Sequence, residues 1–209
     1  MIFSLHSLRS NTLHYLFWKM GLAQADTQTT EAERTALARY ASDRRRLVEI
    51  GVWHGVTTTI LRRVMAADAI LFAVDPFSPG QLGFSAQKLI AHGEVNRQDK
   101  GTVRWVETTG VNAAKMLRAA REDPIDFIFI DGDHSYEGLK EDWDAWRPLI
   151  ARGGTVALHD SRSTATRAID DAGSVRFTAE VIKKDPHFRV VDEIDSLTVL
   201  RRVTSELGD

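Results

Sequence analysis

The chain has 209 residues, of which 43% are hydrophobic and 27% charged, enough for one globular domain with a sizeable core. The net charge of -2 provides no overall basic field, so neither nucleic acid nor an anionic membrane is expected as a partner. Cysteine is absent, which excludes disulfides, thiolate metal sites and a cysteine nucleophile.

No stretch of the sequence reaches the roughly 18 apolar residues that a membrane-spanning helix needs. The first residues also lack the basic start and long apolar core of a signal peptide. Together with the absence of cysteine, these features predict a cytoplasmic protein.

Residues 1–44 are predicted to form a helical extension. Apolar side chains recur there at roughly helical spacing, namely Leu5, Leu8, Leu13, Leu16 and Phe17. Gly21 is a suitable stop, and Thr30 with Glu33 has the spacing of a capping box that would begin a second helix. This extension either packs beside the main fold or serves as a lid or a dimer contact, so a homodimer is one expectation.

Residues 45–203 alternate between strand and helix patterns. Strands are predicted at 47–50, 70–74, 102–106, 125–130 and 155–158. Helices are predicted at 56–67, 85–97, 111–121 and 136–150. Two final strands, 188–191 and 197–200, lie too close together for a crossover helix and must pair antiparallel. The prediction is a Rossmann-like α/β fold with a seven-stranded, mostly parallel sheet and a C-terminal antiparallel hairpin.

The first strand leads into a turn containing Gly51 and Gly55, a pattern that lets the backbone approach a ligand closely. It lacks the third glycine of a dinucleotide-binding turn, and Glu49 before it would repel a diphosphate. Asp75 ends the second strand, where a carboxylate can accept hydrogen bonds from a ribose diol. Each feature alone fits a simple structural turn, but together they indicate an adenosine-type ligand without a phosphate.

The fourth strand ends in the sequence Asp131-Gly132-Asp133-His134, at the edge of the sheet where open α/β folds bind ligands. The fifth strand, which should be its neighbour, ends in His159-Asp160-Ser161. An alternative is that Asp133 or Ser135 merely caps the helix that follows.

These motifs resemble the class I S-adenosylmethionine-dependent methyltransferases over roughly residues 45–202. The stretch I-D-G-D-H-S-Y-E-G-L-K-E-D and the later W-R-P-L-I-A-R-G-G-T-V-A-L-H-D are similar to the macrocin-type small-molecule and sugar O-methyltransferases. The resemblance implies that S-adenosyl-L-methionine is the cofactor. It also implies a cofactor-binding set, which we extend with Trp53 in the glycine turn: Glu49, Gly51, Trp53, Gly55, Asp75, Thr108 and Asp131.

A metal ion is also implied, because related enzymes bind Mg²⁺ through the first aspartate after strand four and an acidic pair after strand five. Asp131 and Asp160 match these positions, whereas Ser161 departs from the pair because a hydroxyl is a weaker ligand than a carboxylate. For the catalytic base, Asp133 matches the position proposed in sugar O-methyltransferases. His134 competes with it, because histidine ordinarily exchanges protons near neutral pH.

We therefore expect an enzyme that transfers a methyl group to a hydroxyl of a small molecule such as a sugar or natural product, with or without help from Mg²⁺. The alternative is an inactive S-adenosylmethionine-binding or scaffold protein of the same fold. Three arginines after strand five, Arg162, Arg167 and Arg176, could contact an anionic substrate or could simply belong to the surface. Glu137, Glu141, Asp142 and Asp144 are expected on a solvated helix face, and Trp143 and Trp146 in the core.

Overall fold

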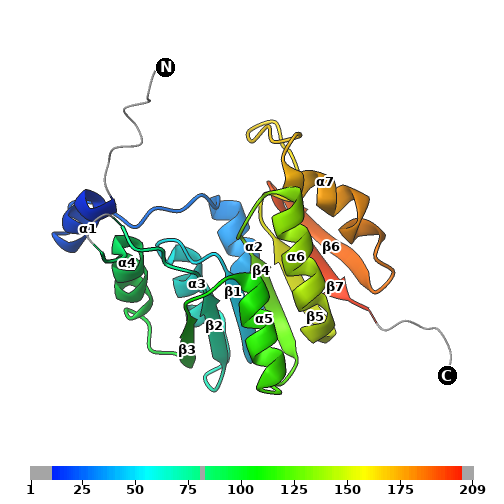
Figure 1. Ribbon diagram of the computed structural model, residues 1–209, viewed down its shortest axis with the longest axis horizontal. Helices are drawn as coiled ribbons and strands as arrows, with labels where there is room; N and C mark the ends of the chain where they lie inside the picture. The colour runs from blue at the N-terminus through cyan, green and yellow to red at the C-terminus, as the bar shows by residue number, and fades with distance from the viewer. Residues whose placement is uncertain (1–10, 81–82, 204–209) are drawn as a thin grey trace.

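The computed structural model describes residues 11–80 and 83–203, so Leu5 and Leu8 of the predicted first helix lie outside the described part. One seven-stranded sheet runs through the molecule in the order β3-β2-β1-β4-β5-β7-β6 (Figure 1). Its strands are β1 (Arg46–Ile50), β2 (Ile70–Val74), β3 (Thr102–Val106), β4 (Ile125–Ile130), β5 (Ile150–Leu158), β6 (Phe188–Ile194) and β7 (Leu197–Arg202).

The strands from β1 to β5 pair in parallel, while β7 is antiparallel to both β5 and β6. This confirms the predicted parallel sheet with a terminal antiparallel hairpin. The carboxyl ends of β1, β2, β3 and β4 consequently meet at one edge, and the loops that leave them are brought together there.

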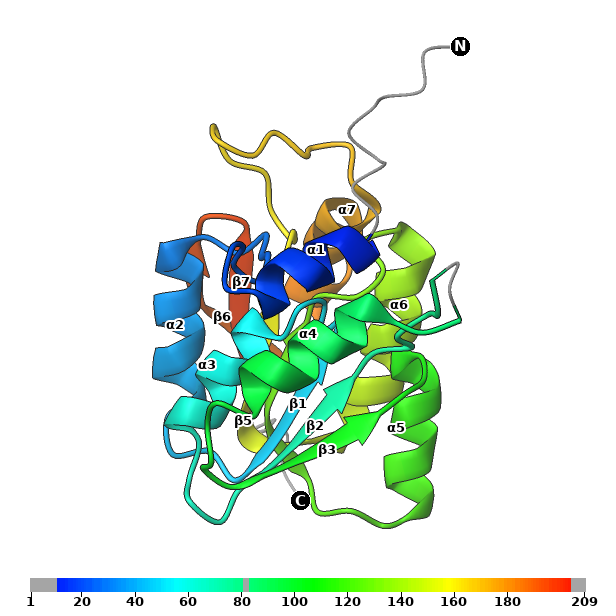
Figure 2. The same cartoon turned by 90° about the vertical axis from the view of Figure 1, so that its left-hand side faces the viewer.

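Helices cover both faces of the sheet (Figure 2). The α-helices are α1 (Asn11–Lys19), α2 (Glu31–Ala41), α3 (Val56–Val64), α4 (Ala86–Val95), α5 (Gly110–Ala119), α6 (Tyr136–Trp146) and α7 (Gly173–Glu180), with 3-10 turns η2 (Arg147–Leu149) and η3 (Ile182–Lys184). One apolar cluster packs α5, α6 and α7 against the sheet, and another packs α2 and α3 against its other face. None of the described helices is long and apolar enough to cross a membrane.

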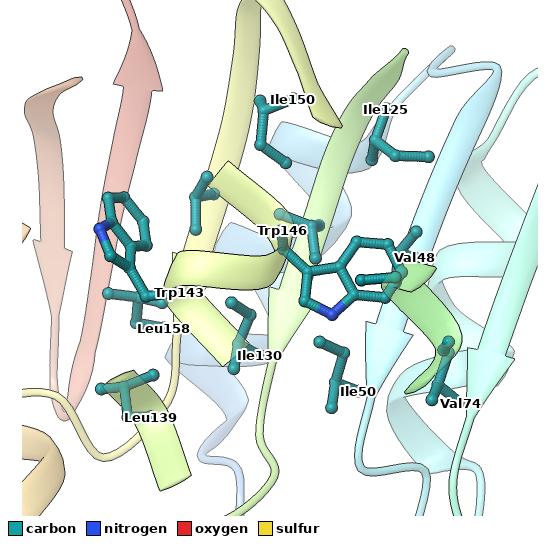
Figure 3. Packing of buried hydrophobic residues seen from close by; sticks show 14 of the residues in the cluster. Val48, Ile50, Val74, Ile125, Ile130, Leu139, Trp143, Trp146, Ile150 and Leu158 are labelled. Carbon is teal, nitrogen blue, oxygen red and sulfur yellow. The ribbon is translucent and has the colours of Figure 1, made fainter. Parts of the chain in front are cut away.

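Trp143 and Trp146 lie in the core between α6 and the sheet, as predicted (Figure 3). The Trp146 indole N–H donates a 3.1 Å hydrogen bond to the carbonyl of Gly110, the first residue of α5. The bond joins the start of α5 to the end of α6, and so fixes the position of the loop that follows β3.

Two element boundaries differ from the prediction for local reasons. Helix α6 ends at Trp146 instead of residue 150, because Pro148 lacks a backbone N–H to continue the helix. Strand β5 begins at Ile150 instead of residue 155, because the chain pairs Ile150 with Ile125 before a bulge. The residues between Ile150 and Thr155 include Gly153, which has a φ of 73°.

The N-terminal extension packs against the main fold through both of its helices. The capping box is present: Thr30 Oγ1 accepts a hydrogen bond from the Glu33 N–H, and the Glu33 carboxylate accepts one from the Thr30 N–H. Helix α1 lies along α4 (Figure 2), and the Trp18 indole N–H donates a hydrogen bond to the Glu94 carboxylate. The division at residue 44 and a homodimer contact stay predictions.

Candidate active site

A cleft of about 670 Å³ opens where the loops after β1, β2, β3 and β4 meet. Seven residues predicted from the sequence line it: Gly51, Trp53, Asp75, Thr108, Asp131, Asp133 and His134. Three others do not, namely Glu49, Gly55 and Asp160. The structure thus brings most of the predicted site residues together in one cleft, and the other three lie outside its lining.

The two glycines of the turn after β1 are needed for different close approaches. Gly51 has a φ of +85°, and a Cβ there would collide with the backbone carbonyl of Asp131. Gly55 has a φ of +76°, and a Cβ there would lie 3.0 Å from the backbone of Ala91 in α4. Gly51 therefore lets the ends of β1 and β4 converge at the floor of the cleft, whereas Gly55 permits helix packing.

Asp75 is buried at the end of β2 and braces the glycine turn. Its Oδ2 accepts hydrogen bonds from the N–H groups of Val52 (3.0 Å) and Trp53 (3.2 Å), and from the side-chain amide of Gln87 (3.1 Å). Its Oδ1 accepts a 2.7 Å hydrogen bond from the Phe77 N–H. These four bonds fall on one carboxylate. Only one of them falls on Oδ1, so the contact of Asp75 with a ribose stays a prediction that this oxygen can meet.

Glu49 lies in β1, two residues before Gly51 of the turn. It is fully buried and accepts a hydrogen bond from the Thr57 hydroxyl. Burial raises the pKa of Glu49 to about 8, and the nearby charges of Asp131 and Asp75 act in the same direction. The side chain is therefore protonated near neutral pH. Its predicted contact with the cofactor stays a prediction.

Asp131 belongs to a buried chain of charges that begins in the N-terminal extension. His159 Nδ1 lies 2.9 Å from Asp131 Oδ1, and His159 Nε2 lies 3.4 Å from the Glu33 carboxylate. Burial would lower the pKa of His159, but Asp131 and Glu33 raise it to about 10. Burial would likewise raise the pKa of Glu33, but His159, Thr30 and Ser196 lower it to about 2. An imidazolium thus stands between two carboxylates.

His134 and Asp133 point toward different parts of the cleft. His134 Nε2 lies 3.5 Å from Asp131 Oδ1, beside the buried His159. Asp133 Oδ1 instead accepts a 2.8 Å hydrogen bond from the Ser135 N–H, and its side chain packs over Gly138 in the first turn of α6. Ser135 is the N-cap itself, since its hydroxyl accepts a 3.0 Å bond from the Gly138 N–H.

The predicted metal ligands, Asp131 and Asp160, each lie beside a basic side chain, and the metal stays a prediction. The Asp160 carboxylate is buried and forms an ion pair with the positively charged guanidinium of Arg167. Asp131 faces His159, and the ligand atoms of Asp131, His134 and His159 all lie within 4.8 Å of one another. The Ser161 hydroxyl is buried against the carbonyls of Leu158 and Ser196, at 2.9 and 3.1 Å. His159 and Arg167 therefore lie beside the two aspartates to which the resemblance assigns a metal.

The segment between α1 and α2 contributes a wall of the cleft that the sequence did not reveal. Asp26, Thr27 and Gln28 line the cleft. The Asp26 N–H donates a 3.0 Å hydrogen bond to Nδ1 of the buried His54, and burial lowers the pKa of His54 to about 4, which keeps it a neutral acceptor. Gln28 accepts a 3.3 Å hydrogen bond from Arg167. No local pattern marked this segment, because only the fold brings it over the glycine turn.

The prediction that Asp142 lies on a solvated acidic face of α6 is wrong. Asp142 is 7% exposed and lines the cleft, and Glu141 lines it as well. Burial raises the pKa of Asp142 to about 6, and the neighbouring Asp133 and Glu141 add to this effect. A signal was present in the sequence, because Asp142 lies three residues after Leu139 and four before Trp146, on the buried stripe of the helix.

Comparison with known proteins identifies the family. A methyltransferase domain family matches residues 48–161, more than half of the chain. The chain belongs to this methyltransferase family. Its seven-stranded sheet with a terminal antiparallel hairpin is the predicted fold of class I methyltransferases.

Solved structures with low sequence identity share the fold of this methyltransferase. TomG of Streptomyces achromogenes, an O-methyltransferase of tomaymycin synthesis, matches with a TM-score of 0.66, 14% identity, and 95% and 93% coverage of the two chains. An O-methyltransferase of Bacillus cereus matches with a TM-score of 0.60, 18% identity, and 93% and 90% coverage. The uncharacterised protein y4gI of Sinorhizobium fredii is 25% identical over 121 residues, which are 56% of this chain and 13% of that longer protein.

The cleft has the properties that an adenosyl cofactor requires. Its volume of about 670 Å³ is typical of small-molecule sites, which range from about 300 to 1,000 Å³. Gly51, Gly110 and Gly132 expose backbone along it. The described lining contains several carboxylates and no lysine or arginine, which suits a ligand that carries a sulfonium and an ammonium group.

Proposed function

We propose that this methyltransferase transfers the methyl group to a hydroxyl oxygen of a small molecule such as a sugar or natural product. The observation that carries the proposal is the contact between His134 and Asp131 at the wall of the cleft, 3.5 Å apart. An imidazole that faces a carboxylate is a common arrangement for removing a proton from a hydroxyl. The fold shared with two proteins described as O-methyltransferases supports the same assignment.

Methyl transfer to oxygen is an in-line displacement in which the bound cofactor supplies the electrophilic methyl group. The protein must hold the acceptor oxygen in line with that group and take its proton. We assign proton removal to His134. Its Nε2 side faces Asp131, which leaves Nδ1 to accept the proton from the acceptor hydroxyl.

Asp131 orients His134, and the buried His159 and Glu33 hold Asp131 in turn. Asp131 lies between His159 and His134, so it is placed to stabilise the imidazolium that forms on His134. Asp133 is bound to the first turn of α6 and is assigned to holding that turn instead of to proton transfer.

The charges around the cleft favour a neutral or cationic acceptor over an anionic one. The carboxylates that line the cleft are Asp26, Asp75, Asp131, Asp133, Glu141 and Asp142. Arginines that could have met an anion are engaged elsewhere: Arg167 pairs with Asp160, and Arg162 donates to the Asp195 carbonyl. Ser161, which departs from the metal-binding pair, donates hydrogen bonds to the backbone carbonyls of Leu158 and Ser196.

The proposal is tested with purified protein and a panel of neutral and amine-bearing alcohols, with S-adenosylmethionine as donor. We expect an O-methylated product, identified by NMR. The His134→Ala variant should lower kcat by about 10²-fold or more, whereas Asp133→Asn should retain kcat to within about tenfold. Failure to bind S-adenosylhomocysteine at high micromolar concentration would contradict cofactor use. Methylation of nitrogen alone, or a large loss only in Asp133→Asn, would contradict the proposed acceptor or base.

A further inference from the structure

Two histidines and an aspartate meet beside the turn after β1, apart from the groups assigned to methyl transfer. His14 Nε2 lies 3.8 Å from Asp26 Oδ2, and His54 Nδ1 lies 3.9 Å from the same oxygen. The ligand atoms that the three residues offer all lie within 4.8 Å of one another. The residues belong to α1, to the segment between α1 and α2, and to the glycine turn, so only the fold brings them together.

His14 has a buried ring nitrogen that nothing in the described part of the chain satisfies. Its Nε2 atom is shielded from solvent and forms no hydrogen bond there. The ring instead stacks on that of His54, with the two centroids 5.0 Å apart. A buried polar atom without a partner is unfavourable, so this nitrogen indicates a ligand that supplies the missing interaction. An ion pair with Asp26 does not supply it, because 3.8 Å exceeds hydrogen-bonding distance.

His54 and Asp26 have the chemical state that a metal site needs. His54 is 3% exposed, and its Nδ1 accepts a 3.0 Å hydrogen bond from the Asp26 N–H, which places the ring proton on Nε2. Burial lowers the pKa of His54 to about 4, so near neutral pH the ring has no proton to lose before it binds a metal. The Asp26 side chain is 62% exposed and is free to turn toward both rings.

The distances suit an ion after a small adjustment. Zinc bonds of about 2.0–2.2 Å place the ligand atoms of a tetrahedral site about 3.4 Å apart. The two nitrogen–oxygen distances of 3.8 and 3.9 Å are only slightly longer than this. Rotation of the His14 and Asp26 side chains closes the difference, and His54 Nδ1 exchanges the Asp26 N–H for the ion.

We propose that His14, Asp26 and His54 bind a divalent transition-metal ion such as Zn²⁺, with water as the fourth ligand. Two imidazoles and one carboxylate suit Zn²⁺, whereas Mg²⁺ prefers a shell of oxygen atoms. Because residues 26–28 form a wall of the cleft, the ion holds that wall and α1 against the glycine turn. The site is separate from Asp131 and Asp160, and it does not depend on the identity of the methyl acceptor.

The site is tested by calorimetric titration of metal-free protein, purified without a histidine tag, with ZnCl₂. We expect one Zn²⁺ ion per chain at this site, whose binding excess Mg²⁺ does not prevent. His14→Gln and Asp26→Asn each remove a ligand at a position without a buried hydrogen bond to lose, and each should weaken this binding at least about tenfold. His187→Gln, at an exposed position, is the matched control and should keep the wild-type affinity.

A second group of possible ligands, Asp131, His134 and His159, is distinguished by the His134→Gln variant. This variant should retain the ion that His14→Gln loses. The inference is overturned if wild-type protein binds no Zn²⁺. It is equally overturned if His134→Gln abolishes Zn²⁺ binding while His14→Gln and Asp26→Asn retain it, since the ion would then lie beside Asp131.

Discussion

Near the end of β1, Glu49 has a fully buried carboxyl group that accepts a hydrogen bond from the Thr57 hydroxyl. Burial raises its pKa from 4.5 to about 8. In the unfolded chain the group loses its proton above about pH 4.5, whereas the folded protein retains it until about pH 8. The folded state therefore binds more protons across this window, and its stability falls as the pH rises through it.

Glu49→Gln removes this titration while keeping a side chain of similar size. We expect the variant to be more stable than wild type by about 2 kcal/mol at pH 7.5, and to show little difference at pH 4.5. Urea unfolding at the two pH values measures the effect, with the exposed Glu137→Gln as control. An equal difference at both pH values would contradict a raised pKa of Glu49.

Some positions and contacts of the site residues could be predicted from the sequence, and others could not. The positions of Asp75, Asp131 and His134 at strand ends were predictable, because a parallel sheet brings those ends to one edge. The four hydrogen bonds on Asp75 were not, because they come from a turn whose path depends on φ angles at Gly51 and Trp53. Asp160 was predicted to bind a metal, and its pairing with Arg167 depends on a loop without regular structure.

At the scale of elements, helix α2 contacts the sheet through the carboxylate of Glu33 as well as through apolar packing. Glu33 Oε1 accepts hydrogen bonds from the N–H and hydroxyl of Ser196, between β6 and β7, while its other oxygen faces His159. One side chain in the first turn of α2 thus caps its own helix and contacts the ends of β5 and β7. The sequence predicted the cap, but not the contact with residues more than 100 positions away.

We expect Glu33→Gln to lower the free energy of unfolding, because it removes the charge that faces His159. The raised pKa of His159 contributes stability below about pH 6.5 that is lost as the pH rises toward 10. The lowered pKa of Glu33 contributes stability above about pH 4.5 that is lost as the pH falls toward 2. The loss in Glu33→Gln should therefore be largest between about pH 4.5 and 6.5, at about 3 kcal/mol, because a buried pair loses one partner.

Urea unfolding across pH 4 to 9 measures this dependence, with Glu31→Gln in the same helical turn as control. Glu31 is exposed, so its substitution should change the unfolding free energy by about 0.5 kcal/mol or less. A loss in Glu33→Gln that is the same at every pH would mean that Glu33 acts through hydrogen bonding alone and that His159 carries no charge.

At the scale of the whole molecule, the cleft is assembled from distant parts of the chain. The loops after β1 to β4 supply most of its lining, and residues 26–28 of the N-terminal extension complete it. The alternation of strands and helices was enough to predict the sheet and its edge. It could not place the extension, because nothing in its helical pattern specifies which helix of the main domain it packs against.

The charges of the assembled site predict how ligands affect the stability of the whole protein. S-adenosylhomocysteine should raise the melting temperature by several degrees, since a ligand at 100 times its Kd adds about 2.7 kcal/mol to the folded state. Mg²⁺ at 5 mM should change it by less than about 1 °C, because His159 and Arg167 already neutralise the carboxylates of Asp131 and Asp160. Turnover should likewise survive EDTA. A clear shift with Mg²⁺, abolished in Asp160→Asn, would show that Arg167 gives way to a metal and would restore the two aspartates as its ligands.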